Sequence, residues 1–230
     1  MNKFLVVIPT YNEAQSIGLL LLDLKSFNLD VLVVDDGSPD GTAEVARSHG
    51  ALVVSRVKKL GLGSAYRAGF AWALARDYEF VIQMDADGSH QVSDLVNLIS
   101  AAYSADVIIG SRWVKGGAIK NWSKGREILS RSANAYSQFM LGFSIKDSTA
   151  GFRIYSKKIL RTMEVETILS EGYCFQIEMT RRAINYGAKV REVPITFIER
   201  KFGQSKMSFS IAIEAIWRVT IWGFSSLLGR

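Results

Sequence analysis

The chain has 230 residues, of which 48% are hydrophobic, and this size suits one α/β domain with a sizeable core and excludes two full domains. A formal net charge of +6 favours an anionic partner, such as nucleic acid, anionic lipid or a phosphorylated substrate, without choosing among them. The single cysteine, Cys174, excludes an intrachain disulfide, and no stretch reaches the roughly 18 consecutive apolar residues that a membrane-spanning helix needs.

The first half of the sequence alternates short apolar strands with helices. Strands are expected at residues 3–8, 31–34, 51–56, 80–84 and 107–109, and helices at 14–26, 41–49, 64–76 and 92–102. Such alternation is typical of βαβ units, whose strands pair in parallel. We therefore predict an α/β fold with a mostly parallel central sheet and helices on both faces.

The second half is mixed rather than repetitive. After a loop rich in Gly, Lys and Trp that follows residue 111, we expect helices at 126–142, 157–163 and 173–186 and strands at 152–155 and 189–197. The sequence contains no internal repeat, low-complexity segment or convincing interdomain linker. One domain followed by a C-terminal tail is therefore expected.

Acidic side chains follow two of the expected strands. Asp35 and Asp36 come after the second strand, and Asp85 and Asp87 come after the fourth. Because ligands of such sheets bind outside the carboxyl ends of the strands, both clusters should face one crevice. An Asp-x-Asp pair offers hard oxygen ligands to Mg²⁺ or Mn²⁺, which bridge diphosphates, although turn and helix-capping roles explain a lone pair equally well. The preceding apolar strand and the second cluster favour the metal site.

A glycine-containing turn, Gly-Leu-Gly-Ser-Ala-Tyr at residues 61–66, follows a strand and opens a helix. A turn of this kind could cradle a phosphate, but it lacks the third glycine of the dinucleotide-binding fingerprint at the expected place. We therefore interpret it as a tight turn that lets helix and sheet approach closely. An oxidoreductase function with a nicotinamide cofactor would depend on this turn alone.

Several motifs together resemble family 2 glycosyltransferases with the GT-A fold. These motifs are Pro-Thr-Tyr-Asn-Glu at 9–13, Val-Val-Asp-Asp-Gly-Ser-Pro-Asp-Gly at 33–41 and Met-Asp-Ala-Asp at 84–87. Further segments resemble the branch that synthesises dolichol-phosphate or polyprenol-phosphate mannose, namely 110–112, 147–153, 171–173 and 199–206. The similarity runs in the expected order from about residue 3 to residue 210.

The resemblance implies a donor site for a sugar nucleotide. The nucleotide pocket would be lined by Pro9, Tyr11, Glu13, Val34 and Asp36, with Asp36 toward the base or ribose. The sugar diphosphate would be held by Asp85, Ala86 and Asp87, with Mg²⁺ or Mn²⁺ on the two carboxylates. Some members carry Gln as a further metal ligand where this chain has Ser89, so a hydroxyl or a water would have to substitute. His90 is expected either to support these ligands or to be exposed.

Basic side chains of the second half are candidates for phosphate binding, because Arg in particular binds phosphate bidentately. They are Arg112, Arg126, Arg131, Arg153, Arg200 and Lys206. The resemblance assigns Arg112, Arg126, Arg200 and Lys206 to the phosphates of donor and acceptor, and makes Asp87 with Arg112, Arg200 and Lys206 the expected catalytic set. A small register error would exchange Arg126 with Lys124 or Arg131.

The activity that the resemblance implies is transfer of mannose from GDP-mannose to a polyprenyl (dolichyl-type) monophosphate, which gives a lipid-linked mannose donor for glycosylation. A lipid phosphate is already an anionic nucleophile at neutral pH, so it needs positioning more than deprotonation. Its oxygen would attack the anomeric carbon opposite the departing nucleoside diphosphate, with inversion. Gln176 and Glu178 could contact sugar hydroxyls, and packing of one helix face explains them equally well.

Two segments bear on contact with a membrane. The helix at 126–143 has an apolar face that fits either core packing or an interface. Residues 209–224 combine two Trp with Ile and Phe, as in a helix at headgroup depth, so we expect 208–230 to form an amphipathic, membrane-interfacial tail after a catalytic domain of 1–207. The apolar run at 4–8 is too short for a signal peptide. The protein is therefore expected in the cytoplasm, peripheral on the cytoplasmic face of a membrane.

Other functions remain as alternatives. One is a transferase of the same fold that uses glucose or another sugar, or a different acceptor such as a glycan. Another is a non-catalytic module that binds sugar nucleotide or lipid, against which the joint presence of Asp36, Asp85, Asp87, Arg200 and Lys206 argues. No clustered basic helix or aromatic stacking motif supports binding of nucleic acid. The sequence does not set the length of the polyprenol, the metal, the oligomeric state or the need for an anchoring partner.

Overall fold

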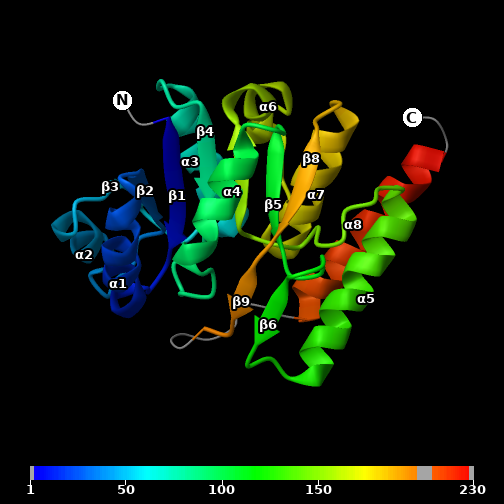
Figure 1. Ribbon diagram of the computed structural model, residues 1–230, viewed down its shortest axis with the longest axis horizontal. Coiled ribbons are helices and arrows are strands. Elements are labelled where there is room, and N and C mark those ends of the chain that lie inside the picture. The colour runs from blue at the N-terminus through cyan, green and yellow to red at the C-terminus, as the bar shows by residue number, and fades with distance from the viewer. Residues whose placement is uncertain (1–2, 201–208, 228–230) are drawn as a thin grey trace.

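The computed structural model describes residues 3–200 and 209–227 (Figure 1). The strands are β1 (Phe4–Thr10), β2 (Asp30–Asp35), β3 (Leu52–Ser55), β4 (Phe80–Gln83), β5 (Val107–Ser111), β6 (Ala118–Lys120), β7 (Arg153–Ser156), β8 (Val190–Pro194) and β9 (Thr196–Ile198). The α-helices are α1 (Ala14–Leu24), α2 (Thr42–Ser48), α3 (Leu62–Leu74), α4 (Leu95–Ala102), α5 (Lys124–Leu141), α6 (Lys157–Thr162), α7 (Gly172–Asn185) and α8 (Phe209–Leu227). Short 3₁₀ turns lie at Lys25–Phe27, Val92–Asp94 and Val165–Thr167.

A seven-stranded sheet in the order β3-β2-β1-β4-β7-β5-β8 forms the centre of the fold. Every neighbouring pair is parallel except those of β7, which runs antiparallel between β4 and β5. The predicted α/β architecture with a mostly parallel sheet is therefore confirmed. The antiparallel β7 is the strand predicted at 152–155, and nothing in its sequence sets its direction.

Alternate residues of the strands build two cores, one on each face of the sheet. In β1, Leu5 and Val7 pack toward α3, α6 and α7, whereas Val6 and Ile8 pack toward α1, α2 and α4. All four side chains are fully buried. A strand covered on both faces reads as a continuous apolar run, because its two sets of side chains point into two apolar environments. This is why the run at 4–8 could be assigned from sequence.

The strand predicted at 189–197 is two strands that belong to different sheets. Pro194 has no N–H to donate, and β8 ends there. The next N–H, of Ile195, donates to the carbonyl of Ser111, and β9 then pairs in parallel with β6. Because β6 lies in the segment predicted as a loop, the β6–β9 pair joins two stretches of chain that the sequence left unconnected.

The C-terminal helix α8 packs against α5 and α7, and Figure 1 shows α5 and α8 side by side at the end of the molecule opposite β3. The hydroxyls of Tyr136 and Thr220 lie 2.5 Å apart across this contact. Gly223 allows the close approach, since a Cβ there would lie 2.6 Å from the carbonyl oxygen of Met140. The expected boundary between residues 207 and 208 lies outside the described residues.

An apolar surface remains exposed on these two helices. It consists of Ile128, Leu129 and Phe139 on α5 and Ile216, Trp217, Ile221 and Phe224 on α8. Of the two tryptophans in α8, Trp217 is 63% exposed, whereas the ring of Trp222 lies 5.4 Å from the guanidinium of Arg181. Along 3–200 and 209–227, no helix is both long enough and apolar enough to cross a membrane.

Candidate active site

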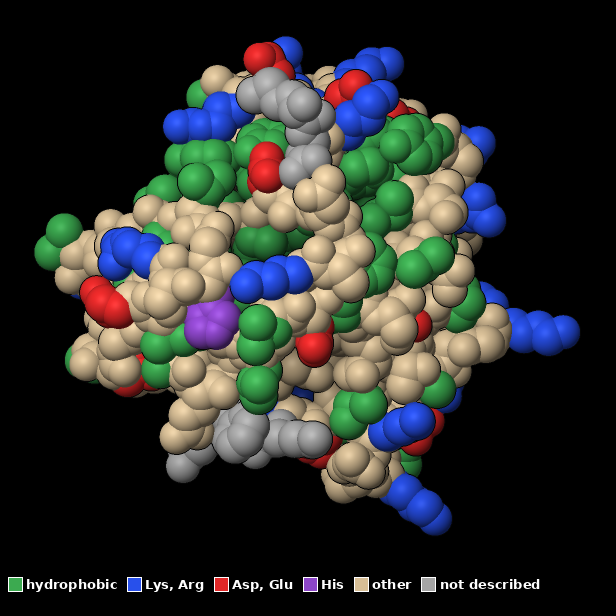
Figure 2. All heavy atoms as spheres, turned by 60° about the vertical axis from the view of Figure 1, so that its left-hand side comes forward, with side chains coloured by type: hydrophobic (Ala, Val, Ile, Leu, Met, Phe, Trp, Pro, Cys, Tyr) green, Lys and Arg blue, Asp and Glu red, His purple; other side chains and the backbone are tan. Residues whose placement is uncertain are grey.

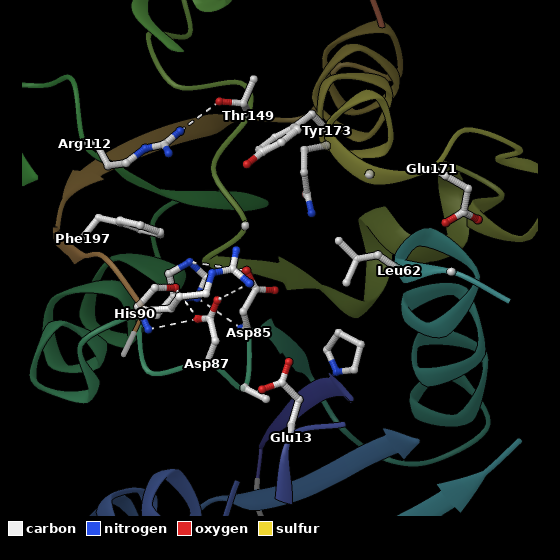
Figure 3. Close-up of a pocket in the computed structure, with 18 of the residues that line it drawn as sticks. Glu13, Leu62, Asp85, Asp87, His90, Arg112, Thr149, Glu171, Tyr173 and Phe197 are labelled. Atoms are coloured by element: carbon white, nitrogen blue, oxygen red, sulfur yellow. Dashed lines mark hydrogen bonds and ion pairs between the residues drawn. The ribbon is translucent and has the colours of Figure 1, made fainter. Parts of the chain in front are cut away.

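A cavity of about 400 Å³ opens beside the carboxyl ends of β1 and β4. Among the residues expected from the sequence, its wall contains Pro9, Glu13, Asp85, Ala86, Asp87, Arg112, Arg126 and Arg200. Figure 3 shows Asp85 and Asp87 close together, with Glu13 on one side and the ring of Tyr173 extending from α7 on another. The fold therefore brings acidic groups of the first half against basic groups of the second.

The two carboxylates of the Asp-x-Asp pair are held by different partners. The hydroxyl of Tyr66 donates to Asp85 Oδ1 at 2.9 Å. Ser89 donates to Asp87 Oδ1 from its backbone N–H and from its hydroxyl, at 3.1 and 2.6 Å, and Arg200 Nη1 lies 3.4 Å from Asp87 Oδ2. Burial alone would raise the pKa of Asp87, but the hydrogen bonds from Ser89 and the charge of Arg200 lower it below its ordinary value. Asp87 is therefore ionised at neutral pH.

This pair of carboxylates fits a divalent cation that is coordinated partly by the protein and partly by a phosphorylated substrate. No cluster of three or more His, Cys, Asp or Glu side chains suited to a metal occurs in the part of the chain that the structure describes. Mg²⁺ is commonly held by one or two carboxylates, with phosphate oxygens and waters completing its shell, so Asp85 and Asp87 suffice for this class of site. The hydroxyl of Ser89, at the place of the expected Gln, is used to orient Asp87.

His90 supports the pair and is not exposed. The residue is 3% exposed, and its ring lies against those of Phe152 and Phe197, with ring centroids 5.0 and 5.6 Å away. The backbone N–H of Asp85 donates to His90 Nδ1 at 3.2 Å, which leaves the proton of the neutral ring on Nε2. Burial lowers the pKa of His90 although Asp85 and Asp87 oppose the shift, so the ring is neutral at neutral pH.

Three residues expected in the nucleotide pocket, Tyr11, Val34 and Asp36, do not line this cavity. The Val34 side chain is completely buried in the core on the α3 side of the sheet. The Asp36 carboxylate accepts hydrogen bonds from the Arg56 side chain and from the backbone of residues 60 and 61, at 3.0 and 3.1 Å for the latter two. It therefore holds the 56–61 segment, of which Lys59 and Gly61 line the cavity. The Tyr11 ring lies 4.3 Å from Lys59 Nζ, and Lys59 lines the cavity.

The glycine turn that opens α3 holds a carboxylate from far along the chain. Glu171 accepts hydrogen bonds from the backbone N–H groups of Gly63 and Ser64, at 2.7 and 3.0 Å. N–H groups in the first turn of a helix have no partner within the helix and lie at its positive end, so a carboxylate is stabilised there. A Cβ at Gly61, where φ is +97°, would lie 2.6 Å from Glu171 Oε2, and one at Gly63 would lie 2.7 Å from the Ser170 carbonyl. The turn was predicted to let helix and sheet approach closely, but these two glycines allow the close approach of the 170–171 segment.

Arg112 is buried in an aromatic and acidic environment. Its Nε and Nη2 donate to Asp147 at 2.8 and 2.6 Å, and Nη2 also donates to Thr149 at 2.9 Å. Its guanidinium lies 5.3 to 5.5 Å from the ring centroids of Trp122 and Phe197. Burial alone would lower the pKa of Arg112, but Asp147 raises it. Arg112 thus keeps its charge at the cavity wall while Asp147 fixes its position.

Arg126 faces the cavity, and its neighbour in sequence Arg131 does not. Arg126 forms an ion pair with Glu199 and lies 4.2 Å from the ring centroid of Trp122. Arg131 pairs with Glu127 on the exposed side of α5 and does not line the cavity. Of Lys124, Arg126 and Arg131, among which the sequence did not decide, the cavity wall contains Arg126.

The remaining basic candidates differ in accessibility. Arg153 is completely buried and donates to the carbonyl oxygens of Ser148, Ala150 and Gln176 at 2.6, 2.7 and 3.1 Å, so it braces the 148–151 loop against α7. It cannot reach a phosphate in the cavity. Lys206 lies outside the described residues.

Sequence reasoning did not single out several residues of this site. Tyr66 and Glu171 lie in motifs that were noticed, but their partners are 19 and 107 to 108 positions away. Trp122 and Phe197 come from segments far apart in the chain and meet with ring centroids 5.4 Å apart. The richness of the 113–122 loop in Trp was the one signal available for this aromatic wall.

Comparisons with known proteins find relatives that match along nearly the whole chain. Residues 5–163 match the family model described as glycosyl transferase family 2. The chain is 47% identical to a polyprenol monophosphomannose synthase of Mycolicibacterium smegmatis, over 100% of this chain and 90% of that protein. It is 46% identical to an undecaprenyl-phosphate mannosyltransferase of Micrococcus luteus, over 97% of this chain and 95% of that protein.

Solved structures share the fold at low sequence identity. A glucosyl-3-phosphoglycerate synthase from Mycobacterium tuberculosis, crystallised with Mn²⁺, UDP-glucose and phosphoglyceric acid, superposes with a TM-score of 0.67 at 20% identity, covering 99% of this chain and 80% of that one. A mannosyl-3-phosphoglycerate synthase from Rubrobacter xylanophilus gives 0.68 at 20% identity, covering 94% of this chain and 73% of that one. These neighbours confirm the expected GT-A fold.

Proposed function

The chain belongs to glycosyl transferase family 2, and from this premise we propose that it transfers mannose from GDP-mannose to a polyprenyl monophosphate with inversion at the anomeric carbon. The observation that carries the proposal is that one cavity joins Asp85 and Asp87 to Arg126 and Arg200. The names of the two relatives, both mannosyltransferases or mannose synthases for a polyprenyl carrier, support the acceptor and the sugar.

The donor would bind with its nucleotide beside Pro9 and Glu13 and its diphosphate beside the Asp-x-Asp pair. Mg²⁺ or Mn²⁺ held by Asp85 and Asp87 would supply positive charge next to the diphosphate, which makes it a better leaving group. Tyr66 and His90 keep Asp85 in place, and Ser89 does the same for Asp87. Because these contacts are already arranged, the site need not reorganise when charge develops.

In the reaction an oxygen of the acceptor phosphate forms a bond to C1 of mannose, while the bond from C1 to the diphosphate oxygen breaks. The nucleoside diphosphate leaves with the bonding electrons, and no proton has to be removed from the acceptor. Arg126 and Arg200 would position the phosphates, since both line the cavity and carry permanent charge. Lys206 would join them on the grounds of resemblance alone.

The lipid chain would leave the cavity toward α5 and α8. Arg126 lies at the first turn of α5, and the exposed apolar surface of Ile128, Leu129 and Phe139 continues along the same helix. The exposed face of α8 extends this surface with Trp217, an aromatic residue that favours the headgroup region. We infer that the protein lies on the cytoplasmic face of a membrane, with 1–207 as the catalytic domain and 208–230 as a membrane-interfacial tail that follows it.

The competing functions have less support. A transferase for another sugar would share all of these contacts, and only the names of the relatives favour mannose. In Figure 2 the Lys and Arg side chains are scattered among other types over the face in view and form no continuous strip there, which a nucleic-acid groove would require.

The decisive experiment measures transfer of radiolabelled mannose from GDP-mannose to a polyprenyl phosphate in detergent, with Mg²⁺ or Mn²⁺. We expect a lipid-linked product with the wild type and none with Asp87→Ala or after chelation. The same assay with GDP-glucose and UDP-sugars provides the comparison. Product with one of those donors and none with GDP-mannose would discard the mannose assignment, and no product with any donor would favour a binding module.

A further inference from the structure

One buried amide in the cavity wall lacks a hydrogen-bond partner. Gln176 lies on α7, is 3% exposed and lines the cavity. Its Oε1 is fully buried and accepts no hydrogen bond from any residue within 3–200 or 209–227. A buried polar group without a partner destabilises the folded state, so such a group calls for an explanation outside the chain itself.

The position of Gln176 is fixed by two independent contacts. Its main-chain carbonyl oxygen accepts a hydrogen bond from the buried Arg153 at 3.1 Å. The ring of the preceding residue, Phe175, stacks on Tyr66 with centroids 6.0 Å apart, and the hydroxyl of Tyr66 binds Asp85. The main chain from which the amide extends is therefore held by the same framework that holds the Asp-x-Asp pair, which suits a group that recognises part of the donor.

Two comparisons within the chain separate Gln176 from a residue that merely packs. Glu178, two positions later, is also buried, but its carboxylate accepts hydrogen bonds from Ser170 at 2.5 Å and Arg182 at 3.1 Å. Gln83, at the end of β4, has a completely buried amide with no partner among the described residues, yet it does not line the cavity. Gln176 alone of these three combines an unpaired atom with a place in the cavity wall.

We propose that the side-chain amide of Gln176 is the hydrogen-bond partner of one hydroxyl of the transferred hexose and thereby helps to select the sugar. This inference rests on the proposed function and adds a residue that determines specificity. An amide has both a donor and an acceptor, as does a hydroxyl, so the pair is neutral and directional. A site built to pair with a hydroxyl discriminates strongly against a sugar that lacks it, because its own polar group is then left buried and unpaired.

The test is a cycle between the residue and the sugar, run with wild type, Gln176→Leu and Gln176→Asn. For each, kcat/KM is measured with GDP-mannose and with analogues that each lack one sugar hydroxyl. We expect Gln176→Leu to lower kcat/KM for GDP-mannose roughly 10- to 100-fold. One analogue should be poor for the wild type and should lose nothing further in Gln176→Leu, since the same hydrogen bond is already missing.

Gln83→Leu is the matched control, because it removes a buried unpaired amide away from the cavity. It should leave the ranking of the analogues unchanged, and neither leucine variant should have a lower melting temperature than the wild type.

If every analogue shows the same ratio of kcat/KM to that of GDP-mannose in the wild type and in Gln176→Leu, the proposal is wrong. If Gln176→Leu does not fold, Gln176→Asn, which keeps the amide but withdraws it, gives the same comparison. Failure of the wild type with GDP-mannose would instead contradict the proposed function, and the cycle would be run with the donor that it accepts.

Discussion

The two sides of the cavity are built in different ways. On the acidic side, Asp85 and Asp87 follow a strand of the regular sheet, and Ser89, two positions later, orients Asp87. On the basic side, each cation is held by a partner far along the chain. Arg112 depends on Asp147, and Arg126 depends on Glu199.

This difference has a physical consequence. A short-range pair such as Ser89 with Asp87 loses little conformational entropy when it forms, so this part of the acidic side is prepared by local folding. A long-range ion pair forms only when the whole fold is present. When one partner of a buried pair is removed, the remaining charge is buried without compensation and the folded state is destabilised. The basic side should therefore be the part of the site that is most sensitive to substitutions away from the cavity.

The largest effect is expected for Asp147→Asn, which leaves the buried guanidinium of Arg112 without its counter-charge. The free energy of unfolding should fall by about 3 to 5 kcal/mol, as measured by chemical denaturation. The control is Glu127→Gln, which breaks the exposed pair with Arg131 and should cost no more than about 0.5 kcal/mol. Equal effects for the two variants would show that the buried pair does not support the basic side.

A smaller effect, confined to the acceptor, is expected for Arg126→Ala. Loss of one charged hydrogen-bonding group should raise the KM for polyprenyl phosphate roughly 10- to 100-fold and leave the KM for the sugar nucleotide almost unchanged. Arg131→Ala is the matched control on the same helix and should behave like the wild type. A rise in the nucleotide KM alone would move Arg126 to the donor side of the comparison.

On the acidic side, Tyr66→Phe removes the hydroxyl that donates a hydrogen bond to Asp85. Because the net worth of one hydrogen bond is about 1 kcal/mol, kcat/KM for the donor should fall roughly fivefold, with the apparent affinity for Mg²⁺ reduced as well. Tyr78→Phe is its control, since Tyr78 donates to Asp30 at 2.9 Å and does not line the cavity. An unchanged donor kcat/KM in Tyr66→Phe would mean that Asp85 needs no such support.

The smallest effect expected is an absence of reaction at Cys174. Burial, which outweighs the influence of Arg218, raises the pKa of the Cys174 thiol to about 12 from an ordinary value of 9.0. A raised pKa keeps the thiol neutral, so between pH 8 and pH 10 the folded protein should not react with iodoacetamide while the unfolded chain reacts progressively faster. Rapid labelling without loss of activity would show that α8 opens from α7.

The sequence by itself determined the regular parts of this protein. Apolar runs such as 4–8 set the parallel strands because both of their faces are buried, and the motifs around Asp36 and Asp87 identified the family before any geometry was known. Pro9, Glu13, Asp85, Ala86 and Asp87, which the resemblance assigned to the donor site, all line the cavity, because each lies at the end of a strand or the start of a helix in that regular half.

Tertiary structure alone decided how each polar group is used. Val34 points into the core and Asp36 binds Arg56, and neither outcome follows from a motif, because the partner of a side chain lies wherever the folded chain brings it. The same reason explains why Arg126 rather than Arg131 faces the cavity and why the predicted strand at 189–197 divides at Pro194. It also explains why Gln176 Oε1 has no hydrogen-bond partner among the described residues whereas the Glu178 carboxylate has two. Periodicity and motifs describe local preference, whereas hydrogen bonds between distant segments depend on the complete fold.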